Sequence, residues 1–405
     1  MNVFVAIFGL AMLILVHEAG HFFVARAVGM RPRKFYVGFP PALVKVVRNG
    51  IEYGLGAIPL GGYVKIPGMH RPAPSDAALY FDAVAREAPE LLPAVQELKH
   101  HLDTGDFPAA REALTRLERA RDEAELSAPA RKALERGLQE LSDALGPDAY
   151  WRAGTWRRVA VIFAGPATNL LLAVVLFAGL YMFGGGKATS VVDAVIDDRP
   201  AASAGLRPGD RIVAINGAPV AEPEDIPKRI SASDGRPLTV VVDRDGGRVA
   251  LGPVRPQRID GAYRLGFVLR GEGLSPPDAA WAAVKLTGAV TREIGRSLVR
   301  LITGSGRKDI ASPVGIVQGS SNALNAGVQN FLWVMGLISL SLALLNLLPL
   351  LPLDGGHIAF SIVEGIRGRA VGRSVYERVS AVGIAFVLLL FFIGLSNDIG
   401  RLGDG

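Results

Sequence analysis

Four long apolar runs divide the chain, at residues 3–23, 159–183, 331–351 and 379–395. Each is close to the roughly 20 residues that an α-helix needs to cross a bilayer. The first run has no basic start of the kind that opens a secretory signal, so we expect it to be retained. The pattern predicts a polytopic α-helical membrane protein with four transmembrane helices.

Basic residues gather beside these runs. They follow the first run, precede the second and separate the third from the fourth: Arg26, Arg31, Arg33, Lys34, Lys45 and Arg48, then Arg152, Arg157 and Arg158, then Arg367, Arg369, Arg373 and Arg378. Because Lys and Arg concentrate in cytoplasmic loops, we expect these loops inside the cell and both termini outside, with residues 184–330. One outer group opposes this rule: Arg292, Arg296, Arg300, Arg307 and Lys308. We expect the amphipathic stretch 278–302 to lie along the membrane surface.

Three kinds of segment connect the spans. Residues 36–66 alternate, which predicts a small antiparallel sheet with turns at Asn49-Gly50 and Gly61-Gly62. Residues 75–149 have helical spacing, which predicts a cytoplasmic insertion of one or two helical hairpins. Two apolar faces mark it, Phe107, Leu114 and Leu117 on one helix and Leu134, Leu138, Leu141 and Leu145 on another. It is either a solvated insertion or a module for an unknown partner. Residues 190–270 read as short strands.

The predicted parts are the first transmembrane helix (1–29), the membrane-associated sheet (30–74), the helical insertion (75–150), the second transmembrane helix (157–183), an outer domain (188–272), an amphipathic outer region (278–327), and the third and fourth transmembrane helices (328–357 and 379–396).

The composition limits the kinds of ligand, metal site and nucleophile that the chain can use. The chain is 50% hydrophobic and 20% charged, where a soluble chain carries about 25% charged residues. Its net charge of +6 does not indicate nucleic-acid binding, because the basic residues flank the apolar runs. It contains no cysteine, which excludes disulfides, thiolate metal sites and cysteine nucleophiles. Any metal must therefore be held by His, Asp or Glu.

The first run contains His17-Glu18-Ala19-Gly20-His21, which fits the pattern H-E-x-x-H. Positions four apart share one face of a helix, so both imidazoles can bind one ion while Glu18 takes a proton from a metal-activated water. Ionisable groups inside a span are costly and functional by default. The alternative, a polar contact between helices, does not require three such groups at ligand spacing.

A catalytic zinc site usually has three protein ligands. The third run ends in a stretch with two prolines and two glycines, residues 346–357, which disfavours continuous helix. Unwound backbone at membrane depth needs cover from protein or from a water-filled cavity, so Asp354 is the best candidate for the third ligand. His357 is an alternative ligand, and Asp354 could instead be a helix N-cap. His17 lies about 21 Å along its helix, toward the cytoplasmic side, where it can meet Asp354.

Taken together, these motifs resemble the site-2 protease family of intramembrane zinc metalloproteases, in the PDZ-containing bacterial branch that includes the regulator of sigma-E protease. The matching stretches are residues 17–21, 58–65, 163–169, 312–316 and 346–356. The resemblance implies that His17, His21 and Asp354 bind zinc and that Glu18 is the general base.

It also implies that Asn346 positions substrate, and that the sheet at residues 58–64 pairs with an extended substrate strand. Within that sheet we expect Gly61, Gly62 and Tyr63 to contact substrate, although Gly61-Gly62 could equally be a plain turn. A substrate helix must unwind before cleavage, because its carbonyls are hydrogen-bonded, and an exposed strand edge could then capture it. The insertion at 75–149 departs from the family pattern.

The outer domain is similar to a PDZ domain at residues 204–220, where Asn216-Gly217 predicts a tight hairpin and Ile212 and Ala214 alternate with Val213 and Ile215. Residues 265–267 are a candidate carboxylate-binding loop, or a strand bulge. Peptide binding and size exclusion of bulky substrates both remain open. Size exclusion implies that another protease, of the site-1 type, cuts first.

The sequence therefore predicts a multi-pass zinc endopeptidase of the bacterial inner membrane that cleaves single-span membrane proteins, such as anti-sigma factors or signal-peptide remnants. Its active site faces the cytoplasmic side, and its outer PDZ domain and termini are extracytoplasmic. A proteolytically silent PDZ scaffold is one alternative, although neither Glu18 nor Asp354 is lost. A metal transporter is another, but it would need ionisable residues on several spans.

Overall fold

The computed structural model describes residues 1–121, 124–184, 186–259, 261–302 and 311–403. It divides into two compact units, one of residues 1–173 and 291–405 and the other of residues 174–290. Two long helices, α6 (Thr155–Phe183) and α9 (Pro276–Ile302), run from one unit into the other. Arg307 and Lys308 of the predicted basic group lie outside the described residues.

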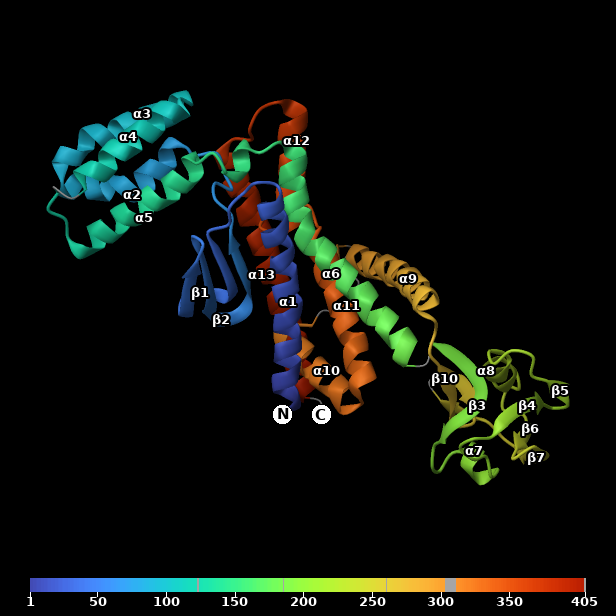
Figure 1. Ribbon diagram of the computed structural model, residues 1–405. Helices are drawn as coiled ribbons and strands as arrows, with labels where there is room; N and C mark the ends of the chain where they lie inside the picture. The colour runs from blue at the N-terminus through green and yellow to red at the C-terminus, as the bar shows by residue number, and fades with distance from the viewer. Residues whose placement is uncertain (122–123, 185, 260, 303–310, 404–405) are drawn as a thin grey trace. The chain divides into compact units, whose positions relative to one another are not determined.

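Four helices of the described chain are long and apolar enough to cross a membrane, which confirms the predicted polytopic α-helical class: α1 (Asn2–Ala27), α6, α11 (Val328–Asn346) and α13 (Arg373–Gly403). The third span is shorter than predicted, because α11 ends at Asn346. The motif at residues 353–356 instead opens a separate helix, α12 (Asp354–Arg367), after a loop with two prolines. A further helix, α10 (Pro313–Asn325), contacts α1, α11 and α13 (Figure 1).

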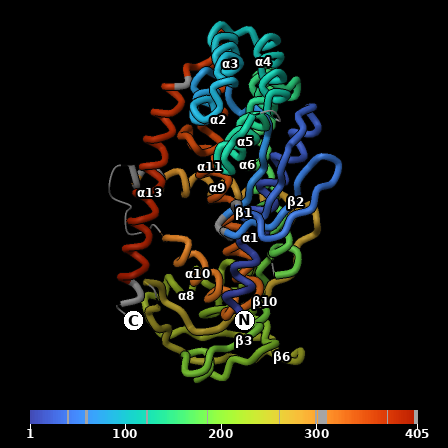
Figure 2. The backbone as a smooth tube through the Cα atoms, turned by 90° about the vertical axis from the view of Figure 1, so that its left-hand side faces the viewer, coloured from blue at the N-terminus to red at the C-terminus, as the bar shows by residue number. Residues whose placement is uncertain are grey.

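Two long strands, β1 (Lys34–Arg48) and β2 (Ile51–Lys65), form an antiparallel sheet that lies beside α1 (Figure 2). The predicted turn at Asn49-Gly50 is present, with φ angles of +52° and +76°. The predicted turn at Gly61-Gly62 is wrong, since both residues lie inside β2. Each strand bends, so residues 34–37 pair with both 52–55 and 62–65. Residues 58–65 consequently form one edge of the sheet.

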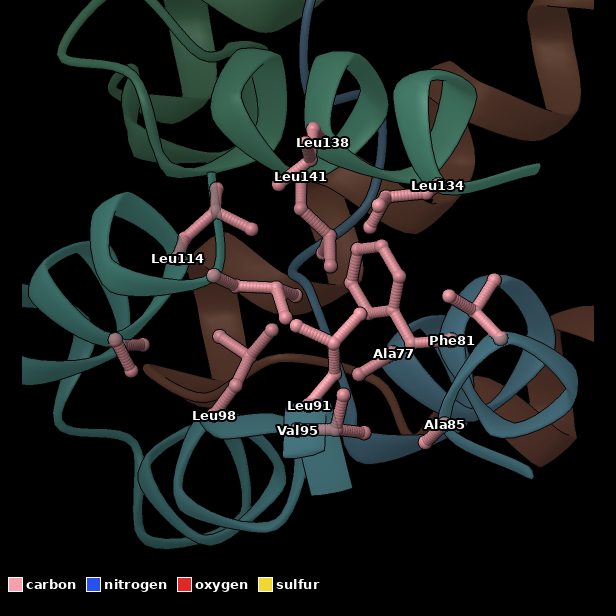
Figure 3. Close-up of a cluster of buried hydrophobic side chains, with 14 of the residues drawn as sticks. Ala77, Phe81, Ala85, Leu91, Val95, Leu98, Leu114, Leu134, Leu138 and Leu141 are labelled. Atoms are coloured by element: carbon pink, nitrogen blue, oxygen red, sulfur yellow. The ribbon is translucent and has the colours of Figure 1, made fainter. Parts of the chain in front are cut away.

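The described residues of the insertion form four α-helices with a hydrophobic core of their own (Figure 3). Both apolar faces predicted from the sequence are buried in this core. Asp106 and Ser127 cap two of the helices through their side chains. The helices are α2 (Pro74–Glu87), α3 (Leu92–Thr104), α4 (Phe107–Ala120) and α5 (Ala128–Leu145), with short 3₁₀ turns at Pro89–Leu91 and Tyr150–Arg152.

The second unit contains an antiparallel sheet in the order β10-β3-β4-β6-β7, with β5 paired to β4 and a separate β8–β9 pair. Its strands are β3 (Lys187–Val195), β4 (Arg211–Ile215), β5 (Ala218–Pro219), β6 (Leu238–Arg244), β7 (Gly247–Val254), β8 (Gln257–Ile259), β9 (Ala262–Arg264) and β10 (Phe267–Glu272), with helices α7 (Pro200–Ser203) and α8 (Asp225–Ser231). Asn216 and Gly217 form the predicted hairpin turn, both at positive φ. The predicted alternation in β4 is wrong: its register shifts between Ile212 and Ala214, so Ile212 and Ile215 are both buried.

Candidate metal centre

Helix α1 carries His17, Glu18 and His21 in its second half. The two histidines are one helical turn apart on the buried face and are only 6% and 7% exposed. This burial is unusual for imidazoles and requires polar partners. The structure therefore has to satisfy two buried imidazoles inside an apolar helix.

Asp354 comes from a different part of the chain. It is the first residue of α12, and Leu353 rather than Asp354 is the N-cap, so the N-cap alternative is wrong. Gly355 and Gly356 allow the backbone of α12 to approach the loop after α11, because a Cβ on either would collide with backbone atoms of residues 347–351. A carboxylate in the first turn also suits the helix dipole.

The three side chains converge. Nε2 of His17 lies 3.2 Å from Nε2 of His21, and Oδ2 of Asp354 lies 3.1 and 3.3 Å from these two nitrogens. Tetrahedral zinc with bonds of 2.0–2.1 Å would hold its ligand atoms about 3.3 Å apart. The described residues contain no other group of three such side chains that could hold a metal ion.

The protonation of these groups also fits a cation. Nδ1 of His21 lies 2.8 Å from the carbonyl oxygen of Val161 and must donate to it, which leaves a lone pair on Nε2. Oδ2 of Asp354 is buried without a hydrogen-bond partner among the described residues. Lone pairs thus face one another in a buried space, and a bound metal ion would satisfy them. The donor set of two imidazoles and one carboxylate is a common zinc set.

Helix α6 packs closely against the two histidines. A Cβ on Gly165 would collide with His21 and would lie 2.9 Å from Cε1 of His17. Four residues further along the same face, the amide nitrogen of Asn169 lies 3.3 Å from Nδ1 of His17. Both residues lie in the stretch 163–169 that resembles the family, but neither is among the site residues predicted from the sequence. Their spacing of four in an apolar helix was the available signal.

Glu18 faces the sheet. A Cβ on Gly62 would collide with Cγ of Glu18, so the Glu18 side chain packs directly against β2. The carbonyl of Lys65 accepts from Arg33 within the sheet at 2.7 Å. Since backbone groups alternate in direction along a strand, those of Gly62 and Val64 point to the open edge. The open edge of β2 therefore lies directly beside Glu18.

The remaining predicted residues are not part of the three-residue group. The ring of Tyr63 lies 6.3 Å from that of Tyr36, and burial raises the pKa of Tyr63. Asn346 ends α11 and is partly exposed. His357, the alternative ligand, has Nδ1 2.6 Å from the Tyr376 hydroxyl and is not part of the three-residue group. The structure thus favours Asp354 over His357 as the third ligand.

Comparison with known proteins decides the family. The profile of Peptidase family M50 matches residues 5–390. The chain belongs to peptidase family M50. The protein Atu1380 of Agrobacterium fabrum, which is named as a zinc metalloprotease, is 31% identical over an alignment of 412 residues, which covers 97% of this chain and 94% of that protein. Zinc metalloprotease Rip1 of Mycobacterium tuberculosis is 29% identical over 442 residues, covering 95% and 91%.

As a member of family M50, the chain is a zinc-dependent metalloprotease of the site-2 protease family and an integral membrane protein. This confirms the predicted family, enzyme class and cofactor. The alternatives of a silent scaffold and a metal transporter are accordingly set aside. The M50 match also spans the insertion, the segment that the sequence analysis could not place in the family pattern.

Proposed function

We propose that this M50 protease is an intramembrane endopeptidase that cleaves single-span membrane proteins within or near the bilayer. The proposal is supported by the position of Glu18, which directly follows the ligand candidate His17 and packs against β2 at Gly62. A peptide that added to the open edge of β2 would pass next to the metal site. A soluble substrate would have no need of a site built on a transmembrane helix.

In this proposal His17, His21 and Asp354 hold the zinc, and Glu18 is the general base. When bound, zinc supplies Lewis-acid activation of water and of the scissile carbonyl. Glu18 receives the proton that the attacking water loses and can pass it to the leaving amine. The contact with Gly62 holds the Glu18 side chain against β2.

Substrate selection would rest on β2. An unwound segment needs partners for its freed backbone groups, and the outward-facing groups of Gly62 and Val64 can supply them by strand addition. Gly61, Gly62 and Tyr63 are proposed to lie along this contact, with Asn346 on the far side of the substrate. Gly62 has the strongest support, because its missing side chain leaves room for Glu18.

The proposed topology follows the basic loops. Both termini and the second unit are extracytoplasmic in a bacterial inner membrane, and the metal site lies toward the cytoplasm. The strand order of the second unit leaves β10 with a free edge next to Gly266, which has φ +86°. A PDZ-type role, either binding peptide ends or excluding substrates that an upstream protease has not shortened, is compatible with that free edge.

A comparison of purified wild type and Glu18→Gln in detergent tests the proposal. Both should contain about one zinc per chain, and only the wild type should cleave a panel of single-span substrates, because the substitution removes the base but no ligand. Equal cleavage by both proteins would assign the activity to a contaminant. Cleavage restricted to soluble peptides would contradict an intramembrane substrate.

A further inference from the structure

An ion-pair cluster joins the helical insertion to the sheet. Arg33, just before β1, has Nε 2.7 Å from Oδ1 of Asp143 and Nη1 2.9 Å from Oδ2 of Asp148. Lys65, the last residue of β2, has Nζ 2.8 Å from Oε1 of Glu140 and 3.3 Å from Oδ2 of Asp143. We call these five residues the clamp. Two cations from the sheet thus meet three carboxylates from the insertion.

The clamp is partly shielded from water. The side chains of Lys65 and Asp143 are 12% and 11% exposed. Burial alone would lower the pKa of Lys65, but the hydrogen bond to Glu140 and the charge of Asp143 raise it above its usual value. Ion pairs in such a setting are screened less than surface pairs, and loss of one partner leaves an unpaired charge behind.

The insertion is also fixed at its two ends. The backbone N–H of Tyr150 donates to Pro67 at 2.8 Å, and that of Trp151 donates to Gly68 at 3.1 Å. The indole N–H of Trp151 donates to the Ala144 carbonyl at 2.7 Å. The segment that leaves β2 is thus hydrogen-bonded to the segment that ends the insertion. The helices between these two segments have their own core (Figure 3). The insertion is therefore a separately packed group of helices that is attached at the C-terminal end of β2.

The clamp acts on β2, the strand that packs against Glu18, the proposed general base. Arg33 and Lys65 are hydrogen-bonded to each other through the backbone, so both ends of the clamp meet at one point of the sheet. From Lys65 to Gly62 is three residues, or about 10 Å along a strand. A shift of β2 at the clamp would be transmitted to the position of Gly62 beside Glu18.

We propose that the helical insertion is a brace that sets the position of β2 for substrate, with Arg33, Lys65, Glu140, Asp143 and Asp148 as positioning residues. The inference rests on the proposed function, since it takes the open edge of β2 as the substrate strand. No residue of the clamp touches the metal ligands. The clamp therefore acts mainly on how well substrate pairs with β2, and it reaches Glu18 only through Gly62.

The test uses the full-length double variant E140Q/D143N, which removes two carboxylate charges without changing side-chain size. Zinc content should equal that of the wild type. KM for a single-span substrate should rise about tenfold with kcat within about twofold, the pattern of lost binding. Backbone amides of β2 should exchange hydrogen at least about tenfold faster. The matched control is Glu97→Gln, which removes the 2.5 Å pair with Arg116 on another face of the insertion and should change neither value.

A double-mutant cycle on Lys65→Met and Glu140→Gln adds a second readout, in which the effects on KM should be less than additive because the two side chains form one pair. Unchanged KM and unchanged exchange in E140Q/D143N would overturn the brace. Faster exchange with unchanged KM would also overturn it, because β2 would then move without affecting substrate. Failure of the wild type to cleave any substrate would instead contradict the proposed function.

A different contact supports a second inference, at Asn169. This residue is fully buried in α6, and its side-chain oxygen has no hydrogen-bond partner among the described residues. Its amide nitrogen faces Nδ1 of His17. If Nε2 of His17 binds a metal, the neutral ring carries its proton on Nδ1, and that N–H needs an acceptor. A half-turn of the amide presents the oxygen of Asn169 to this proton.

We propose that Asn169 is the positioning residue that fixes the tautomer and orientation of His17. Asn169→Leu and Asn169→Ala, which offer no acceptor, should weaken zinc binding about 10–100-fold in a chelator competition. Asn169→Asp, which keeps an acceptor, should bind zinc at least as tightly as wild type. Ser339→Ala, which removes only a hydrogen bond to the backbone oxygen of Asn169, is the control for packing. Wild-type affinity in the Leu and Ala variants, or equal weakening in all three, would overturn the assignment.

Discussion

The contact between Gly62 and Glu18 allows a single methyl group to test the geometry of the site. In Gly62→Ala the new Cβ would collide with Cγ of Glu18 and would lie 3.1 Å from Cδ of Glu18 and 3.2 Å from Cγ2 of Ile14. Carbon atoms prefer separations of about 3.5–4.0 Å, so the carboxylate must move by about 1 Å. A misplacement of about 1 Å costs a reaction about 100-fold, or about 2.7 kcal/mol of transition-state stabilisation.

We therefore expect Gly62→Ala to lower kcat about 100-fold while one zinc per chain is retained, because no ligand is touched. Single-turnover cleavage and zinc content are measured together. Gly179→Ala is the matched control, since a Cβ there has no neighbour within 4 Å, and it should cleave like wild type. Wild-type turnover in Gly62→Ala would refute the reasoning that β2 and Glu18 are in contact. Loss of zinc would show that the strand supports the ligands instead.

Three further predictions concern other parts of the molecule. Gly165→Ala should weaken zinc binding, measured by chelator competition, because its Cβ would displace His21 and His17. Leu134→Ala, at a fully buried site in the insertion, should destabilise the helices by about 2–5 kcal/mol in denaturant-dependent hydrogen exchange without changing zinc content. Hydrogen bonds from Arg244 lower the pKa of Asp210. The contribution of Asp210 to stability is therefore complete above its unfolded pKa of about 4, and it disappears as pH falls through the lower folded pKa. Hydrogen exchange in β4 should accelerate in acid, and it should accelerate less in Asp210→Asn.

The spans and the H-E-x-x-H motif could be predicted because both depend on local periodicity. Apolar length alone identifies a transmembrane helix, and a spacing of four alone places His17 and His21 on one face. Asp354 could be predicted because prolines and glycines in an apolar run show where a helix must stop. In each case the signal lies within about 20 residues of sequence.

The contacts between distant segments could not be predicted in this way. Gly61-Gly62 reads as a turn by its composition, whereas the glycine at 62 is needed because Glu18 approaches the strand. Arg33 reads as a topology signal, yet it pairs with Asp143 and Asp148 more than 100 residues away. Asn169 is spaced four residues from Gly165, but this spacing does not show which side chain Asn169 meets, because His17 lies on another helix. Such features follow from tertiary packing alone.

We propose that His17, His21 and Asp354, from two distant segments, form one zinc site. X-ray absorption at the zinc edge of the full-length Glu18→Gln protein tests it most directly, together with the zinc content of Asp354→Ala. We expect about one zinc per chain with nitrogen and oxygen ligands at about 2.0–2.2 Å, including two imidazoles, and a large loss of zinc in Asp354→Ala. Zinc binding and a ligand shell unchanged in Asp354→Ala would contradict it.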